Sequence, residues 1–274
     1  MAGRLIVCPT PIGNLGDMTP RVRDALVDAD LVACEDTRRT GLLFDRLDIP
    51  RPRFVSNHEG NEEERVVQLT QAIERGTRVA LVSDAGMPAI SDPGFRLIRA
   101  CVERDLDVEV LPGPSSILVA LVASGLPPDR WRFEGFLPRR PGELERVLGG
   151  AETVIAFESP RRLPASLAAL AALAPDRPAA VCRELSKLHE EVARGTLAEL
   201  ARQFQEDVKG EIVVVIGPSS RQAGRPDMAF AVDALRRLVQ SGARPRAAAG
   251  VVAALTGTRA NDLYRELTGR EPRR

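Results

Sequence analysis

Residues 5–17 read LIVCPTPIGNLGD, and this stretch joins a short apolar segment to a loop rich in proline and glycine. The apolar segment 4–8 predicts a buried strand, and TPRVRDALV after the loop predicts a helix over 20–29. A strand, a loop and a helix in this order are the layout of a nucleotide site in an α/β protein. The loop matches neither GxGxxG nor GxxxxGK[ST], and it has Pro9 and Pro11 where those motifs have glycines. The stretch therefore predicts an α/β fold whose ligand is not held by a standard phosphate loop.

Short apolar runs alternate with helical patterns along the first half of the chain. This alternation predicts βαβ units and a mostly parallel sheet. Asn61 followed by Glu64 has the spacing of a capping box, which predicts the start of the third helix. Strands are expected at 4–8, 31–34, 53–55, 78–82 and 108–111, and helices at 20–29, 37–47, 61–75, 93–104 and 115–124.

A second lobe is expected after GLPPDRW, whose two prolines interrupt the first pattern. GEIVVVIG, near its end, is the strongest strand signal of the whole sequence. The expected strands are 131–136, 153–157, 179–184, 190–194 and 211–216, and the expected helices are 141–148, 161–174 and 196–206.

The last part of the chain predicts three short helices after a linker, PSSRQAGRP. Their short connections, SGARP and GTRAN, are typical of a helix-turn-helix unit, and a plain three-helix cap on the second lobe fits equally well. We therefore expect an N-terminal α/β lobe over 1–125, a C-terminal α/β lobe over 126–217, a linker over 218–226 and a helical, HTH-like extension over 227–274.

The charge distribution, the apolar runs and the cysteines of the chain limit the kinds of protein and of binding partner that fit the sequence. The formal net charge is zero, yet residues 221–274 carry 11 arginines against five acidic residues. A basic tail on a neutral protein favours a polyanionic partner, and a solvated tail in an arginine-rich chain is the alternative. No apolar run is long enough for a membrane span. Cys8, Cys34, Cys101 and Cys182 form no CxxC pair, which predicts buried free thiols, a cytoplasmic location and no metal site.

Unusual loops follow all five predicted strands of the first lobe. In open α/β sheets, ligands bind outside the carboxyl ends of the strands, so these loops predict a site. The fourth loop is dense in residues that fix special backbone conformations. The first, fourth and fifth loops contain no lysine or arginine before Arg96, which favours a nucleoside with little negative charge over NAD or ATP. The loops are CPTPIGNLGD, CEDTRRTG, SNHEGNEEE, SDAGMPAISDPG and PGPSS.

CPTPIGNLGD, CEDTRR, SDAGMPAISDPG, LPGPSS and RELSKLHEE, in this order, resemble the ribosomal RNA small subunit methyltransferase I family of the tetrapyrrole methylase superfamily. The similarity covers about residues 4–217, and the tail resembles the helical extension of some members. The resemblance implies a two-lobed tetrapyrrole-methylase-like fold with S-adenosylmethionine in the cleft between the lobes. It also implies a homodimer that methylates the ribose 2′-oxygen of a decoding-centre cytidine in 16S rRNA of the small ribosomal subunit.

The resemblance also implies cofactor contacts. Tetrapyrrole methylases usually have a GxGPGD-like first loop, so only Pro11 carries over from PTPIGNLGD. An ordinary core role in its strand is the alternative for Phe157. The implied contacts are Pro11, Ser83, Asp84, Met87, Ser115, Ser116, Phe157, Leu185, Glu211 and Ile212.

Methyl transfer to a ribose hydroxyl calls for a general base, because the hydroxyl is a poor acid. Lys187 and Lys209 are the only lysines among 38 Lys and Arg residues. A desolvated amine can lose its proton, whereas guanidinium cannot, so Lys187 is predicted as the base or as a group that orients the substrate. A salt bridge to Glu190 or Glu191 is the alternative. Glu35 is the second catalytic candidate, with a helix cap as its alternative.

Paired arginines on either side of the expected cleft suit contacts to RNA phosphates. His58 lies in a polar loop, where an RNA contact and a solvated side chain are both consistent with the sequence. The candidates for RNA binding are Arg38, Arg39, His58, Arg139, Arg140, Arg161 and Arg162.

Two other functions fit parts of the sequence. A methyltransferase acting on a corrin or siroheme precursor would use the same cofactor, and arginines would suit the carboxylates of that substrate. The basic tail favours RNA, because a small tetrapyrrole has no use for it. A ligand-sensing regulator with a DNA-binding tail would need the cofactor loops but no general base.

Overall fold

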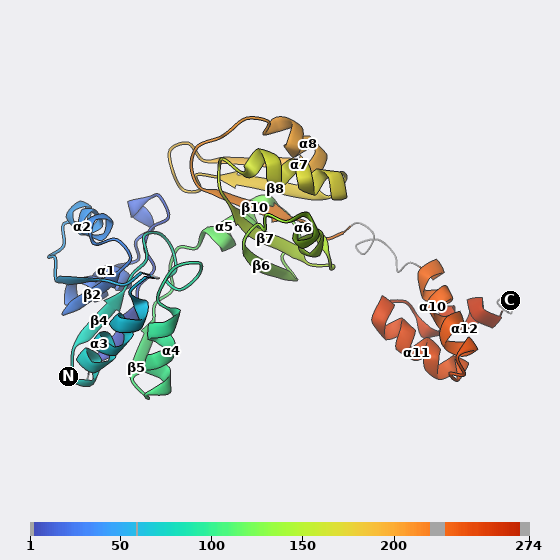
Figure 1. The fold of residues 1–274 in the computed structure, drawn as a ribbon, viewed down its shortest axis with the longest axis horizontal. Coiled ribbons are helices and arrows are strands. Elements are labelled where there is room, and N and C mark those ends of the chain that lie inside the picture. Colours follow the sequence, from blue (N-terminus) through green and yellow to red (C-terminus); the bar gives the residue numbers. More distant parts are fainter. Residues whose placement is uncertain (1–2, 59, 220–227, 269–274) are drawn as a thin grey trace.

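The computed structural model describes residues 3–58, 60–219 and 228–268. Figure 1 shows two α/β lobes, with a group of helices at the C-terminal end of the chain. The predicted α/β class with a C-terminal helical part is confirmed.

The first lobe is built on a five-stranded sheet with the order β3-β2-β4-β1-β5, and its strands are all parallel. The parallel sheet predicted from the alternation of strands and helices is confirmed. In the register of this sheet, Leu5 lies beside Val79 on one side and Val108 on the other. The strands are β1 (Arg4–Val7), β2 (Leu31–Cys34), β3 (Arg53–Ser56), β4 (Arg78–Leu81) and β5 (Asp107–Val110).

Helices cover both faces of this sheet, because successive side chains of a strand point to opposite sides. Ile6 packs into one buried cluster with the first two helices, and Leu5 and Val7 pack into another with the third and fourth. The result is a three-layer lobe whose loops at the carboxyl edge are free to form a site. The helices are α1 (Pro20–Asp28) and α2 (Thr37–Arg46) on one face, and α3 (Glu62–Glu74) and α4 (Phe95–Glu103) on the other.

The second lobe has a mixed sheet with the order β6-β7-β10-β8-β9. Only the β6–β7 pair is parallel, and the other three pairs are antiparallel. One face is covered by three helices that enclose a large apolar cluster. The elements are β6 (Trp131–Phe136), β7 (Thr153–Glu158), β8 (Pro178–Arg183), β9 (Glu191–Thr196) and β10 (Ile212–Ile216), with α6 (Pro141–Leu148), α7 (Leu163–Leu173) and α8 (Leu197–Gln203).

Helix α5 (Ser116–Ser124) connects the lobes. Its buried face packs against the other face of the second sheet, in one cluster with Ile155 and Val213. Ile12, from the first loop of the first lobe, belongs to the same cluster. The predicted domain boundaries stay a prediction: α5 precedes residue 126 but packs on the second sheet. The predicted linker lies outside the described residues from position 220 onward.

The cap predicted at the third helix is wrong in its mechanism. Asn61 occupies the N-cap position of α3 but makes no side-chain capping bond. Its Oδ1 instead accepts from the His58 N–H at 2.8 Å, and its Nδ2 donates to the Ser56 carbonyl at 3.1 Å, so the amide stabilises the preceding loop. A capping box is present at α8, where Thr196 and Glu199 exchange hydrogen bonds.

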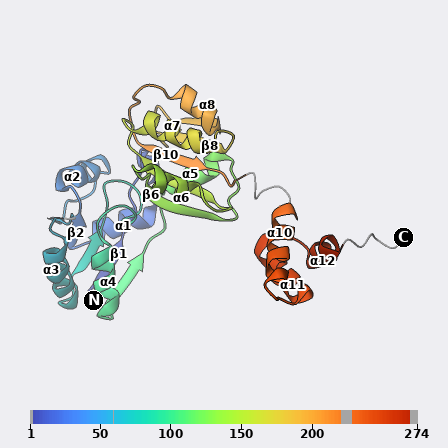
Figure 2. The same cartoon turned by 45° about the vertical axis from the view of Figure 1, so that its right-hand side comes forward.

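The C-terminal helices form a small bundle of their own. Its core includes Leu235, Val252 and Leu263, one from each helix. Figures 1 and 2 both show the bundle apart from the two lobes. The helices are α10 (Met228–Gln240), α11 (Pro245–Thr256) and α12 (Ala260–Thr268).

Free, buried thiols are confirmed for Cys8, Cys34, Cys101 and Cys182. Burial raises the pKa of the Cys8 thiol to about 12, so this side chain stays a neutral core residue. Within the described residues, no helix has both the length and the apolar character needed to cross a bilayer.

Leu167 and Leu173 lie on the same helix, α7, and differ in burial. Leu167 is fully buried in the core of the second lobe, whereas Leu173 is 45% exposed. We expect Leu167→Ala to lower the free energy of unfolding by about 2–5 kcal/mol, because it leaves a cavity in a packed core. Leu173→Ala, the matched control, should cost less than about 1 kcal/mol. Urea denaturation of both variants measures this difference, and equal losses would contradict the packing described.

Candidate functional site

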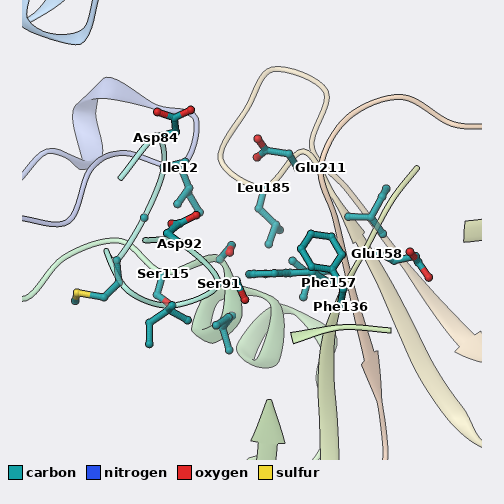
Figure 3. A pocket seen from close by; sticks show the side chains of 18 of the residues that line it. Ile12, Asp84, Ser91, Asp92, Ser115, Phe136, Phe157, Glu158, Leu185 and Glu211 are labelled. Atoms are coloured by element: carbon teal, nitrogen blue, oxygen red, sulfur yellow. The ribbon is translucent and has the colours of Figure 1, made fainter. Parts of the chain in front are cut away.

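A cavity of about 500 Å³ lies between the two lobes, at the carboxyl edge of the first sheet (Figure 3). Loops that follow β1, β2, β4 and β5 supply the wall on the side of the first lobe. The second lobe contributes β6, the end of β7, the turn after β8 and the start of β10. Four of the five unusual loops therefore reach this cavity, and none of the described residues of SNHEGNEEE lines it.

Hydrogen bonds join the first loop to the fourth loop where the fourth loop lines the cavity. Thr10 and Gly86 exchange two backbone hydrogen bonds, of 2.9 and 3.0 Å. The Thr10 hydroxyl also donates to the Ser83 carbonyl at 3.1 Å. Gly86 has a φ of +80°, a conformation that glycine adopts without strain. The proline-walled loop thus holds the neighbouring loop in place by backbone pairing.

Strained backbone gathers around the cavity. Six non-glycine residues of the described chain have a positive φ, and four of them lie in two cavity loops. Ala89 and Ser91 flank Ile90 in the fourth loop, and Glu184 and Ser186 flank Leu185 after β8. Such conformations cost about 1–3 kcal/mol each and persist where the surroundings impose them. Both loops therefore present a fixed side chain to the cavity.

Most of the predicted cofactor residues come together here. Pro11 does not line the cavity, although the adjacent Ile12 does. Ser83 is buried, and its hydroxyl donates to the Gly86 carbonyl at 3.2 Å, so it shapes the fourth loop from behind. The eight that line the cavity are Asp84, Met87, Ser115, Ser116, Phe157, Leu185, Glu211 and Ile212.

An aromatic cluster forms the apolar wall on the side of the second lobe. The Phe157 ring makes edge contacts with Phe133 at 5.0 Å and with Phe136 at 5.7 Å, measured between ring centroids. Phe136 and Phe157 line the cavity, with Leu185 nearby (Figure 3). Phe157 is thus half-buried against the core of the second sheet and also part of the cavity wall. Such a surface suits a flat, weakly polar group such as a nucleobase.

The polar wall of the cavity is strongly acidic. Arg39 is the one basic side chain among the lining residues, and its guanidinium donates to Asp84 Oδ2 at 2.8 Å. The other oxygen, Asp84 Oδ1, is buried and has no hydrogen-bond partner in the described structure. This excess of carboxylates favours a cationic ligand group over a phosphate. The acidic lining residues are Glu35, Asp84, Asp92, Glu158 and Glu211.

Lys187 is held between two carboxylates at the edge of the cavity. Its Nζ donates to Glu184 Oε1 at 2.8 Å and to Glu211 Oε2 at 3.1 Å. Burial works against the ammonium, but these two hydrogen bonds outweigh it and raise the pKa of Lys187. The salt-bridge partners are therefore not the predicted Glu190 and Glu191. A protonated ammonium cannot accept a proton, so this arrangement favours the orienting role over the base.

Glu35 lines the cavity, and the capping role belongs to its neighbour Asp36. Sequence reasoning missed two other carboxylates of the site. Asp92 comes from SDPG at the end of the fourth loop, so its location in that loop was the available signal. Glu158 comes from FESP; its buried carboxylate accepts from the Ser159 N–H at 2.6 Å and pairs with Arg162 at 3.3 Å.

The candidates for RNA binding occupy different environments. Arg38 bonds to Asp36, and Arg140 pairs with Glu143 at 3.8 Å. Arg162 is held inward, because its guanidinium donates to the Leu137 carbonyl at 2.7 Å. Arg39 lines the cavity, and His58, Arg139 and Arg161 are exposed.

The Lys187 ammonium lowers the pKa of Glu184, followed in effect by the backbone N–H of Glu211. We expect Lys187→Met to raise the pKa of Glu184 towards the ordinary value for glutamate. A lowered carboxyl pKa stabilises the fold above the ordinary pKa, and that contribution is lost as the pH falls through the folded-state pKa. NMR titration of the glutamate carboxyls measures the shift. Lys209→Met is the control. An unchanged titration of Glu184 in Lys187→Met would contradict the ion pair between Lys187 and Glu184.

Comparison with known proteins identifies the family. The profile of Tetrapyrrole (Corrin/Porphyrin) Methylases matches residues 4–201. A protein of Mycobacterium bovis named Ribosomal RNA small subunit methyltransferase I is 44% identical, over 96% of this chain and 94% of its own. A protein of the same name from Mesorhizobium japonicum is 44% identical, over 96% of this chain and 90% of its own.

Solved structures agree on the fold. Uroporphyrin-III C-methyltransferase from Thermus thermophilus, complexed with S-adenyl homocysteine, has a TM-score of 0.54 and 21% identity, covering 78% of this chain and 97% of its own. The predicted two-lobed fold and the family resemblance are both confirmed. The chain belongs to the tetrapyrrole methylase family and, within it, to the ribosomal RNA small subunit methyltransferase I family.

Proposed function

We propose that this protein transfers a methyl group from S-adenosylmethionine to the ribose 2′-oxygen of a decoding-centre cytidine in 16S rRNA of the small ribosomal subunit. The observation that carries the proposal is the cavity between the lobes, which joins an aromatic wall to an excess of carboxylates. The names of the curated relatives support ribosomal RNA as the substrate.

The lining residues fit the cofactor. S-adenosylmethionine carries a sulfonium, an ammonium, a carboxylate and an adenosine, and it has no phosphate. The buried and unpaired Asp84 Oδ1 is an acceptor that a ligand donor would satisfy. Phe157, Leu185 and Met87 suit the adenine ring and the methionine chain. The residues that would hold the cofactor are Asp84, Met87, Ser115, Ser116, Phe157, Leu185, Glu211 and Ile212, with Pro11 and Ser83 acting through the loops.

S-adenosylmethionine supplies a methyl group made electrophilic by the sulfonium. The chain itself must align the acceptor hydroxyl with this group and exclude water. Lys187 holds Glu184 and Glu211 in place at the rim, which suits a positioning role. Glu35 lines the same cavity from the first lobe and is the second proposed catalytic residue.

The arginines provide contacts for a large anionic substrate. Arg38, Arg139 and Arg161 are exposed near the ends of the elements that border the cavity. Residues 221–274 add 11 arginines against five acidic residues. Phosphate contacts of this kind position a nucleic acid without reading its sequence, so recognition of one cytidine needs the folded subunit as well. The reaction then takes place in the cytoplasm, on the small subunit.

S-adenosylmethionine labelled in its methyl group tests the substrate. The protein is offered small ribosomal subunits that lack the modification, naked 16S rRNA and a tetrapyrrole precursor. We expect label on a ribose 2′-oxygen of the rRNA. Label on the tetrapyrrole alone would replace the proposal with the corrin or siroheme alternative. Tight cofactor binding with no transfer would favour the sensor.

The substitution Phe157→Ala tests whether the cavity binds the cofactor. We expect the variant to bind S-adenosylmethionine about tenfold more weakly, because contact with the half-buried Phe157 ring would contribute about 1.5 kcal/mol. Phe230→Ala, which removes an exposed ring from the helical part, is the control and should bind as the wild type does. Calorimetry measures both dissociation constants.

A homodimer is the proposed assembly, and the outer face of α5 is its proposed surface. Leu118, Val119 and Val122 lie on this helix and are 51%, 40% and 78% exposed. Exposed apolar side chains grouped on one helix mark an interaction site. A second copy of the chain would cover them.

Val122→Asp places a charge at this surface. We expect the variant to sediment as a monomer at concentrations where the wild type sediments as a dimer, because burying the carboxylate is costly. Val251→Asp, at a position 57% exposed on α11, is the control and should leave the dimer intact. A dimer that survives Val122→Asp would exclude this face.

A further inference from the structure

Asp92 lies at the end of the fourth loop, in a segment whose position is fixed from two sides. Figure 3 shows its carboxylate in the cavity, between Ile12 and Ser91. Ser91, the preceding residue, has a φ of +61°. Two residues further on, the Gly94 N–H donates to the buried carboxylate of Glu62 at 2.9 Å. The backbone on either side of Asp92 is therefore constrained where its side chain lines the cavity.

Several charged and polar groups surround Asp92. Burial, followed by the negative charge of Glu35, raises its pKa to about 6, and the nearby Ser83 hydroxyl opposes the rise. The carboxylates of Asp84 and Glu211 also act to raise it. The nearby cations are already engaged, Arg39 by Asp84 and Lys187 by Glu184 and Glu211.

We propose that Asp92 is the general base, which takes the proton from the ribose hydroxyl as that hydroxyl attacks the methyl group. This inference rests on the proposed function. The O–H bond breaks and its proton passes to an oxygen of Asp92. The electron pair of the hydroxyl oxygen forms the new O–CH₃ bond, and the pair of the broken S–CH₃ bond stays on sulfur.

The other titratable groups of the cavity are less suited to this step. Lys187 is protonated and bonded to two carboxylates. Asp84 accepts from Arg39, and Glu211 is exposed and accepts from Lys187. Glu158 is buried, accepts from the Ser159 N–H and pairs with Arg162. Glu35 contributes the like charge that makes Asp92 the stronger base. A carboxylate whose pKa is raised towards neutrality is better matched to proton transfer than an ordinary one.

The positive charge of the methyl donor would couple the protonation state of Asp92 to the methyl-transfer reaction. A sulfonium near Asp92 favours the charged carboxylate and lowers its pKa, so the base is ionised while the methyl donor is bound. After transfer the sulfur is neutral, and the pKa of Asp92 rises again. The carboxyl group then keeps the proton that it has received, until the product leaves.

Proton release on ligand binding tests this link without any RNA. Calorimetry at pH 6, in buffers of different ionisation enthalpy, counts the protons released by S-adenosylmethionine and by S-adenosylhomocysteine. We expect the wild type to release more protons with S-adenosylmethionine. Asp92→Asn should abolish the difference, whereas Asp92→Glu and the exposed control Asp207→Asn should keep it. An equal difference in wild type and Asp92→Asn would overturn the proposal.

Methyl transfer to the small subunit completes the test. We expect Asp92→Asn, at saturating cofactor, to transfer about 10²–10⁴-fold more slowly than the wild type. S-adenosylhomocysteine should still bind to it within about threefold, which shows that the cavity is intact. Transfer by Asp92→Asn at the wild-type rate would overturn the role of Asp92 as the base but not the proposed function. A wild-type protein that labels no subunit would overturn the proposed function itself.

Discussion

The packing of α5 against the second sheet is the interaction on which the site depends. This helix starts at the cavity with Ser115 and Ser116, and its buried face then packs against Ile155 and Val213. Ile12 joins the same apolar cluster from the loop after β1. Apolar burial of this kind contributes about 25 cal/mol per Å², so it can fix two lobes that share no sheet. The space left between them is the cavity.

The arrangement of the two lobes also brings acidic side chains together around the cavity. A folded protein tolerates such a group of like charges only where function requires it. Five acidic side chains line the cavity, and Arg39 is the one basic lining residue. Carboxylates at short range repel one another more strongly where water is excluded. The chain offsets part of this cost with Arg39 on Asp84 and Lys187 on Glu211. The remainder is a standing negative potential, which a sulfonium and an ammonium would relieve on binding.

The sequence predicted the elements closely, because their signals are local. Apolar runs such as IVVVI and amphipathic stretches such as α4 carry their period within a few residues. The antiparallel pairs of the second sheet were not predictable in this way, since pairing depends on contacts between distant segments. The same limit applies at the site. Loop composition indicated where the cavity lies, but not that Asp92 and Glu158 line it while Pro11 does not and Ser83 bonds within the loop behind it.

The sequence singles out Lys187 for one reason, and its surroundings in the structure indicate another. Its rarity in an arginine-rich chain pointed to chemistry that guanidinium cannot perform. In the structure, the compact ammonium fits between Glu184 and Glu211, where a planar guanidinium fork would need more room. Gly13 packs closely against Lys187, because an added Cβ at Gly13 would lie 2.3 Å from Lys187 Cγ. The first loop therefore restricts the position of the Lys187 side chain. The position thus suits the compact ammonium of lysine, which its two carboxylate partners keep protonated, and proton transfer is left to a carboxylate.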